Sequence, residues 1–240
     1  MHFSVGVFSK TFEEVSEILE PFQENNMGTC PDRYLEFKDI EDECRKQYQE
    51  EHKKTYSTFE EFMEKYYGLV GKDEKMKRYG YWHNPNSKWD WYELGGRFRG
   101  QLLVKDTKPF ILGNAGVFGD KLEEKITPKG YQWVDSAKLK DVEWGLMSKV
   151  YKKIASHNWD TIMKINEEER QIACFLNNIQ KHDTKQTYIE RASKFSTYAV
   201  ITPSESWHEK ESEEWSYNYY DRFIKKADPE LYFTIIDCHI

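Results

Sequence analysis

Residues 231–238 read Leu-Tyr-Phe-Thr-Ile-Ile-Asp-Cys, and this stretch decides the fold. Aromatic and β-branched side chains dominate it, as is typical of β-strands. Its alternating faces carry Tyr232, Thr234 and Ile236 on one side and Phe233 and Ile235 on the other. A strand that is apolar on both faces belongs in the middle of a covered sheet, so we expect residues 231–238 to lie centrally.

A second strand is predicted near the start of the chain. Residues 2–8 show the period-two pattern of a half-buried strand, in which Phe3, Val5 and Val7 alternate with His2, Ser4 and Gly6. Thr11 follows, three residues before Glu14, which is the capping-box arrangement that begins a helix. Strands at both ends of a chain with helices between them favour an α+β fold.

Further elements are predicted between these two strands. Strands are expected at 133–134 and 197–201, and helices at 142–155, 160–180 and 213–226. Residues 40–67 are heavily charged and indicate two helices that break near 54–57, before a second capping box at Thr58. We therefore predict a single α+β domain over residues 1–240. It has a central, mainly antiparallel sheet with helices packed on it, and a charged helical insertion at about 40–68.

A hairpin is predicted in the middle of the chain. Residues 88–92 and 97–104 both alternate, and Gly95 and Gly96 lie between them as turn residues. The glycines in residues 113–119 predict a surface loop, because they lack the strand-then-helix context of a dinucleotide fingerprint.

The composition indicates a folded protein. Among 240 residues are 16 Tyr and 8 Trp, whose large rings can form a core in a chain with few aliphatic residues. No stretch approaches the roughly 20 apolar residues of a membrane helix, and the first residues lack a signal-peptide pattern, so we expect an intracellular protein. The net charge of −7 argues against bulk binding of nucleic acid or an anionic membrane. The 4 cysteines form no C-x-x-C pair and predict neither a zinc site nor a disulfide framework.

The most distinctive chemistry lies in residues 79–99, which combine aromatic rings, cations and adjacent glycines. Rings that stack on a base and cations that bind phosphate are what a nucleotide pocket needs, and glycines let backbone amides approach a ligand. The predicted ligand-binding residues are Lys88, Trp89, Asp90, Trp91, Tyr92, Gly95, Gly96 and Arg97. In this hypothesis Trp89 or Trp91 stacks on a base. Lys88 and Arg97 contact its phosphate. The same side chains also suit a core, an ion pair and a turn, so a purely structural role is the alternative.

A metal site is a second hypothesis. Asp237 and His239 share one face of the last strand, a spacing that two metal ligands can use. His83 and Asp90 would complete the site if the predicted hairpin lies beside that strand. Such a metal would activate water for attack on a phosphoester.

Several phrases of the sequence resemble one family. These are Met1-His2-Phe3, Leu19-Glu20-Pro21-Phe22-Gln23-Glu24-Asn25-Asn26, Asn84-Pro85-Asn86-Ser87-Lys88-Trp89-Asp90-Trp91-Tyr92 with Gly95-Gly96-Arg97, and Asp237-Cys238-His239-Ile240. The chain is similar to uncharacterised hypothetical proteins of bacteriophages and prophages that share a K-W-D-W-Y-x-x-G-G-R motif and a D-C-H-I ending. The resemblance spans the start, middle and end of the chain, and it carries over no catalytic residue.

The resemblance implies an accessory phage protein that acts in the host cytoplasm. Together with the aromatic and cationic motif, it leads us to expect a binding protein without a cofactor. Such a counter-defence factor would sequester a nucleotide-type signalling ligand or block a host defence protein. The alternatives are a metal-dependent phosphoesterase that acts on a nucleotide and a virion component.

Overall fold

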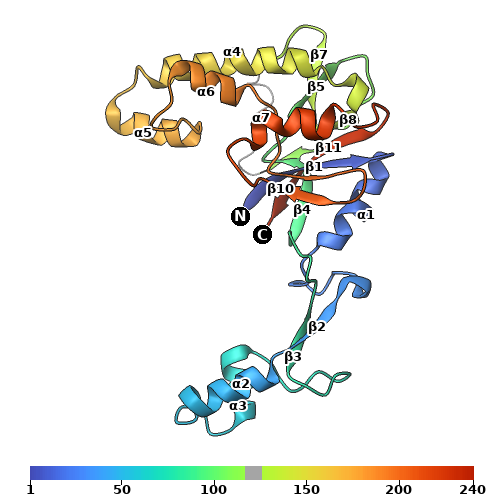
Figure 1. The fold of residues 1–240 in the computed structure, drawn as a ribbon, viewed down its shortest axis with the longest axis vertical. Coiled ribbons are helices and arrows are strands. Elements are labelled where there is room, and N and C mark those ends of the chain that lie inside the picture. Colours follow the sequence, from blue (N-terminus) through green and yellow to red (C-terminus); the bar gives the residue numbers. More distant parts are fainter. Residues whose placement is uncertain (117–125) are drawn as a thin grey trace. The chain divides into compact units, whose positions relative to one another are not determined.

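The computed structural model describes residues 1–116 and 126–240. The chain divides into two compact units, which we call the sheet unit (Met1–Ile18 and Trp91–Ile240) and the helical unit (Leu19–Asp90). The chain contains both helices and strands (Figure 1), and the predicted α+β fold is confirmed. The description of residues 1–240 as one domain stays a prediction.

The sheet unit is built on a sheet of seven described strands in the order β10-β9-β1-β11-β4-β6, with β8 also paired to β11. Their bounds are β1 His2–Ser9, β4 Trp91–Gly96, β6 Asn114–Ala115, β8 Ser136–Lys138, β9 Ala199–Ile201, β10 Trp207–Glu209 and β11 Tyr232–His239. Neighbours run antiparallel except in the β1–β9 and β4–β6 pairs, which are parallel. The central position predicted for residues 231–238 is confirmed, because β11 lies between β1 and β4 (Figure 1).

The long helix and the last helix of the sheet unit pack on this sheet, whereas the two helices between them pack on the long helix. The described helices are α1 Val15–Leu19, which begins in this unit, α4 Trp144–Ile162, α5 Glu167–Leu176, α6 Lys185–Ala192 and α7 Trp215–Tyr219, which continues as a π-helical turn over Tyr220–Ile224. Phe8, Phe233 and Ile235 of the sheet form one apolar core with Tyr219 and Phe223 of the last helix. Burial of these rings on one face of β1 and β11 ties the ends of the chain together.

Capping residues in the sequence predicted helix starts correctly, but the length of one helix was predicted wrongly. The capping box at Thr11 is confirmed at the start of a 3-10 turn, Phe12–Glu14, that leads into α1. Glu14 accepts from the Thr11 backbone amide at 3.3 Å, and the Thr11 side chain accepts from the Glu14 amide. The single helix expected at 160–180 is wrong. Chain direction changes there because α4 ends at Ile162, and Asn166 caps a new helix by accepting from the Glu169 amide at 3.0 Å.

The predicted hairpin is also wrong. Strand β4 pairs with β11 and β6, whereas the following strand, β5 Leu102–Lys105, pairs with β7 Tyr131–Val134 in a separate two-stranded sheet. The predicted strand at 133–134 is confirmed as the end of β7. Of the predicted loop at 113–119, Asn114–Ala115 form β6 and residues 117–119 lie outside the described residues.

The helical unit has its own small sheet and core. Strand β2 Glu36–Asp39 pairs with β3 Gly80–His83, and helices α2 Glu41–Gln47, extended by a π-helical turn over Tyr48–His52, and α3 Phe59–Tyr67 complete it. The break expected near 54–57 is confirmed, and the Thr58 hydroxyl caps α3 by accepting from the Glu61 amide at 3.0 Å. Its core consists of Cys44, Tyr48, Phe59, Phe62, Met63 and Tyr79.

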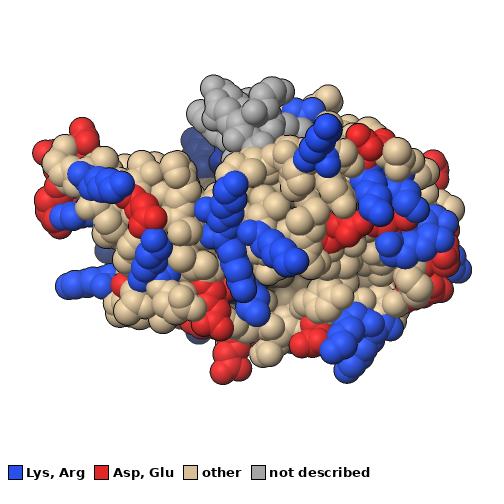
Figure 2. All heavy atoms as spheres, turned by 90° about the horizontal axis from the view of Figure 1, so that it is seen from above, with Lys and Arg blue, Asp and Glu red and all other residues tan. Residues whose placement is uncertain are grey.

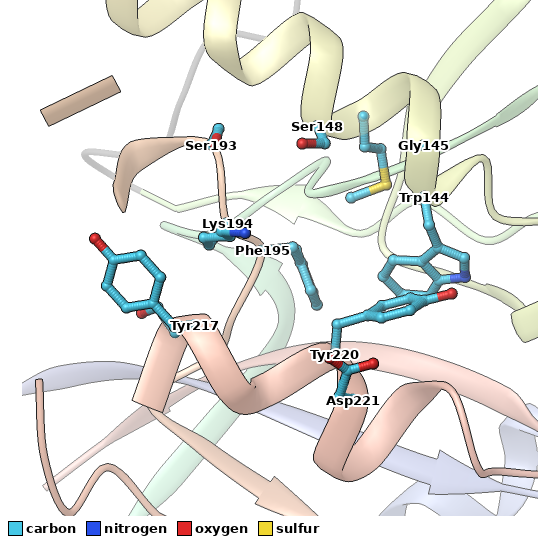
Figure 3. Close-up of a pocket in the computed structure, with 11 residues that line it drawn as sticks. Trp144, Gly145, Ser148, Ser193, Lys194, Phe195, Tyr217, Tyr220 and Asp221 are labelled. Carbon is cyan, nitrogen blue, oxygen red and sulfur yellow. The ribbon is translucent and has the colours of Figure 1, made fainter. Parts of the chain in front are cut away.

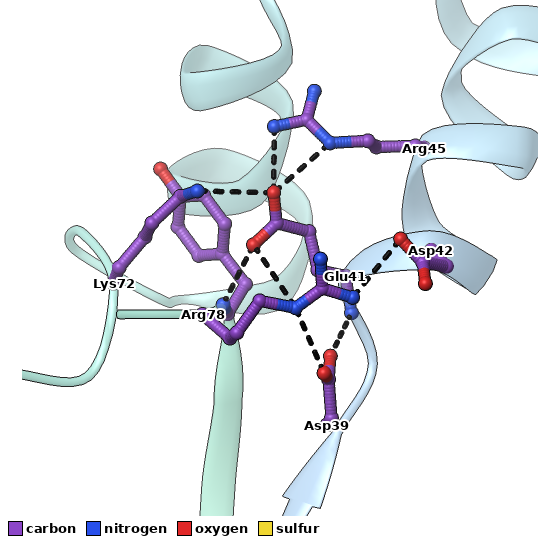
Figure 4. Close-up of polar contacts among 7 residues, drawn as sticks. Asp39, Glu41, Asp42, Arg45, Lys72 and Arg78 are labelled. Carbon is purple, nitrogen blue, oxygen red and sulfur yellow. Dashed lines mark hydrogen bonds and ion pairs between the residues drawn. The ribbon is translucent and has the colours of Figure 1, made fainter. Parts of the chain in front are cut away.

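A buried carboxylate organises the ion pairs of the helical unit (Figure 4). Glu41 is 2% exposed, and its Oε1 accepts from Arg45 at 2.7 Å and Lys72 at 3.1 Å. Its Oε2 accepts from the Tyr79 backbone amide at 3.2 Å. Burial raises the pKa of Glu41, but these hydrogen bonds outweigh burial and lower the pKa to about 2. The cluster joins α2 to the start of β3.

The surface carries both signs of charge. Figure 2 shows Lys and Arg side chains interspersed with Asp and Glu over the face in view. This distribution agrees with a sequence of 35 basic and 42 acidic residues. None of the helices in the described ranges is long and apolar enough to cross a membrane.

Candidate functional site

The residues predicted to bind a ligand fall in both units. Lys88, Trp89 and Asp90 belong to the helical unit, while Trp91, Tyr92, Gly95, Gly96 and Arg97 belong to the sheet unit. The strand expected from Lys88 begins only at Trp91. Each group is therefore described within its own unit.

The two tryptophans of the motif have different environments. Trp89 is 3% exposed, and its Nε1 donates to the Leu19 carbonyl at 3.2 Å. Its own carbonyl accepts from the Glu24 amide at 2.7 Å, so Trp89 lies in the interior of the helical unit. Trp91 is 42% exposed. Of the two rings considered for stacking on a base, Trp91 is the accessible one.

Three neighbouring strands bring four side chains together at one end of the sheet. His239 of β11 is the register partner of His2 on β1 and of Trp91 on β4. The Trp91 ring stacks on His239 at 5.4 Å and 16°, and His2 meets Trp91 edge-on at 5.3 Å and 82°. Asp237 lies two residues before His239 on the same face of β11. We call His2, Trp91, Asp237 and His239 the sheet-end cluster.

Asp237 holds this cluster in place. The side chain is fully buried, and its Oδ1 lies 2.9 Å from His2 Nδ1. Its Oδ2 accepts from the Arg97 backbone amide at 2.8 Å. Because a carboxylate oxygen only accepts, His2 donates through Nδ1, and Nε2 is left to interact with another group. The side chain of His2 is 16% exposed, so the ring reaches solvent.

Two buried carboxylates explain the adjacent glycines. Gly95 and Gly96 have φ values of +75° and +53°. A Cβ on Gly95 would lie closer than 3.0 Å to Asp135, and a Cβ on Gly96 would lie as close to Asp237. Asp135 is fully buried and accepts from the backbone amides of Gly100 at 2.5 Å and Gly113 at 2.8 Å. These carboxylates hold the chain after β4 by accepting from its backbone amides.

The loop amides therefore bind protein carboxylates. In the ligand hypothesis, Gly95 and Gly96 let backbone amides approach a ligand. The Arg97 amide donates to Asp237, and this bond holds the half-buried Arg97 next to the sheet-end cluster. The glycines act in the site by permitting this close approach.

Sequence reasoning missed His2 and Glu93. Glu93 of β4 is the register partner of Asp237, and its Oε1 would lie 2.8 Å from a Cβ on Gly96. The period-two pattern of residues 2–8 did place His2 on the polar face of its strand. The contact with Asp237 joins positions 235 residues apart, and no local pattern predicts such a contact.

The four metal-ligand candidates are also divided. Asp237 and His239 share a face of β11 as expected, but His83 and Asp90 belong to the helical unit. Across residues 1–116 and 126–240, no group of three or more His, Cys, Asp or Glu side chains is placed to hold a metal ion.

A hollow of about 330 Å³ lies elsewhere in the sheet unit (Figure 3). The aromatic part of its wall consists of Trp144, Phe195, Tyr217 and Tyr220. Lys194 also lines it, with Nζ 5.9 Å from the centre of the Tyr217 ring. The hollow is lined by no residue of the 79–99 motif, and no local pattern of the sequence predicts it.

No protein-family model, curated protein or solved structure matches this chain.

Proposed function

We propose that this protein binds a nucleotide-type ligand at the sheet-end cluster, with the base stacked on Trp91. The observation that carries the proposal is an indole ring that is 42% exposed yet already positioned by His239 and His2. A ring held in place before binding loses little conformational freedom when a base stacks on it. Stacking of this kind is worth about 1–3 kcal/mol per base.

Nearby groups suit the anionic part of such a ligand. The Arg97 backbone is anchored at Asp237, which keeps a guanidinium-bearing residue beside the cluster. A guanidinium recognises phosphate through its planar fork, and imidazoles can donate to the same oxygens. Because the chain carries a net charge of −7, attraction of an anion depends on such local groups.

The sequence resemblance to phage proteins supports a role for this binding in counter-defence. A protein that binds a signalling nucleotide withdraws it from the host. Blocking of a host protein, a metal-assisted phosphoesterase and a virion component stay predictions of the sequence, as does action in the host cytoplasm.

Isothermal titration calorimetry with adenosine monophosphate and with a cyclic 3′,5′-diadenylate tests the proposal. Trp91→Ala should weaken binding roughly 5- to 150-fold, the equivalent of about 1–3 kcal/mol. Trp91→Phe should retain part of the affinity, because a smaller aromatic face remains.

Tyr217→Ala is the matched control, since it removes an exposed ring from the hollow of Figure 3. It should bind both nucleotides as the wild type does. Unchanged affinity in Trp91→Ala, or a loss confined to Tyr217→Ala, would refute binding at the sheet end.

A further inference from the structure

We infer that His2 and His239 form a base and acid pair that cleaves a phosphodiester next to a ribose 2′-hydroxyl by proton transfer. The inference rests on the nucleotide site proposed above and gives it a substrate class, a 3′,5′-linked ribonucleotide. Three observations carry it: the bond between Asp237 and His2, the contact between the two imidazoles, and the stacking of Trp91 on His239.

His2 has the arrangement of a general base. Its Nδ1 donates to the fully buried Asp237 carboxylate at 2.9 Å, which fixes the ring and leaves the lone pair on Nε2. A carboxylate in this position also stabilises the imidazolium that forms when Nε2 takes a proton. Because Asp237 is itself held by the Arg97 amide at 2.8 Å, its orientation does not depend on the ligand. Asp237 is thus a positioning residue.

His239 has the arrangement of the matching acid. Its ring centre is 5.1 Å from that of His2, and the planes differ by 72°, so the two imidazoles meet edge to face. The face of Trp91 lies against His239 at 5.4 Å. This stacking fixes the His239 ring beside the position proposed for the nucleobase. Base and acid are thereby distinguished by Asp237, whose carboxylate accepts from His2.

The reaction balances without a co-reactant. His2 Nε2 removes the proton from the 2′-hydroxyl, and the 2′-oxygen forms a bond to phosphorus. The bond from phosphorus to the 5′-oxygen breaks, and this oxygen takes a proton from His239. The products are a 2′,3′-cyclic phosphate and a free 5′-hydroxyl. Proton exchange with water returns both histidines to their starting states.

The experiment uses the full chain with EDTA present and two probes, a linear diribonucleotide and cyclic 3′,5′-diadenylate. Mass spectrometry should detect a 2′,3′-cyclic phosphate product from at least one of them, which identifies the linear or the cyclic class of substrate. The same probes with 2′-deoxyribose should bind and remain intact, because they lack the nucleophile.

Variants assign the roles. His2→Ala and His239→Ala should each slow cleavage about 10²- to 10⁴-fold, the usual effect of losing an acid or a base. Added imidazole should restore part of the rate in His2→Ala, which a purely structural loss does not allow. Asp237→Asn should lower kcat with little change in KM. His182→Ala, a change at an exposed histidine, should cleave at the wild-type rate.

The outcomes separate this inference from the binding proposal. Deoxy probes that bind in a Trp91-dependent way, while the ribose probes stay uncleaved, would leave a binder and overturn the acid–base pair. Cleavage that persists equally in His2→Ala and His239→Ala would overturn it too. Absence of binding to any probe would overturn both proposals.

Discussion

Glu41 shows how one buried carboxylate makes part of the molecule sensitive to acid. Its pKa of about 2 is lower than the 4.5 of a carboxyl without these partners. A lowered pKa contributes stability that is fully present above pH 4.5 and is lost as the pH falls toward 2. The effect belongs to the helical unit, where Arg45 and Lys72 donate to the carboxylate.

We therefore expect Glu41→Gln to be less stable than the wild type at pH 7, because the two cations lose their anion. Between pH 4.5 and 2, its stability should change less with pH than that of the wild type. Urea unfolding at several pH values, followed by a helix signal, measures both effects. Glu64→Gln, at an exposed position of α3, serves as the control. If the free energy of unfolding changed with pH equally in Glu41→Gln and the wild type, this account would be contradicted.

At the scale of elements, local sequence patterns correctly predicted strands and helix starts, because local interactions determine these features. The alternation in residues 2–8 and 231–238 gave correct strands, and the caps at Thr11 and Thr58 gave correct helix starts. The hairpin prediction was wrong. Gly95 and Gly96 are typical turn residues, but here they allow close contact with Asp135 and Asp237. The bond from the Arg97 amide to Asp237 spans 140 positions, beyond the reach of any periodic pattern.

The end of β4 supplies a direct test of those contacts. Gly96→Ala places a Cβ against Asp237 at a φ of +53°, so it combines backbone strain with a clash. Gly130→Ala is the matched control, because its φ is +81° and nothing lies within 4 Å of the added carbon. Backbone strain alone costs about 1–2 kcal/mol, and overpacking adds about 1–3 kcal/mol. Denaturant unfolding should therefore show a larger decrease in the free energy of unfolding for Gly96→Ala than for Gly130→Ala. Equal decreases would mean that the Asp237 side chain moves away from the added carbon at no cost.

At the scale of the whole molecule, the candidate site is an outcome of topology. His2 comes from the start of the chain, Trp91 from the middle, and Asp237 and His239 from the end, and the order β1-β11-β4 makes them neighbours. The sequence predicted that Asp237 and His239 share a face, because side chains two positions apart on one strand point to the same side of the sheet. The partnership with His2 required the strand order, which follows from burial of the whole sheet rather than from any segment.

The two units have separate cores, and this division predicts where each core substitution acts. Phe62 is fully buried in the core of the helical unit, and Ile235 is fully buried in the core of the sheet unit. Phe62→Ala should cost about 3–5 kcal/mol and Ile235→Ala about 2–5 kcal/mol, through lost burial and the cavity left behind. Because each core draws its residues from one unit, the loss should be confined to that unit.

Hydrogen exchange followed by mass spectrometry measures this confinement. In Phe62→Ala, amides of α2 and α3 should exchange faster while those of β1 and β11 keep wild-type protection. Ile235→Ala should give the reverse pattern, so each variant is the control for the other. If either substitution accelerates exchange in both units to the same extent, the chain unfolds as one cooperative body. The single domain predicted from the sequence would then describe its stability better than two cores do.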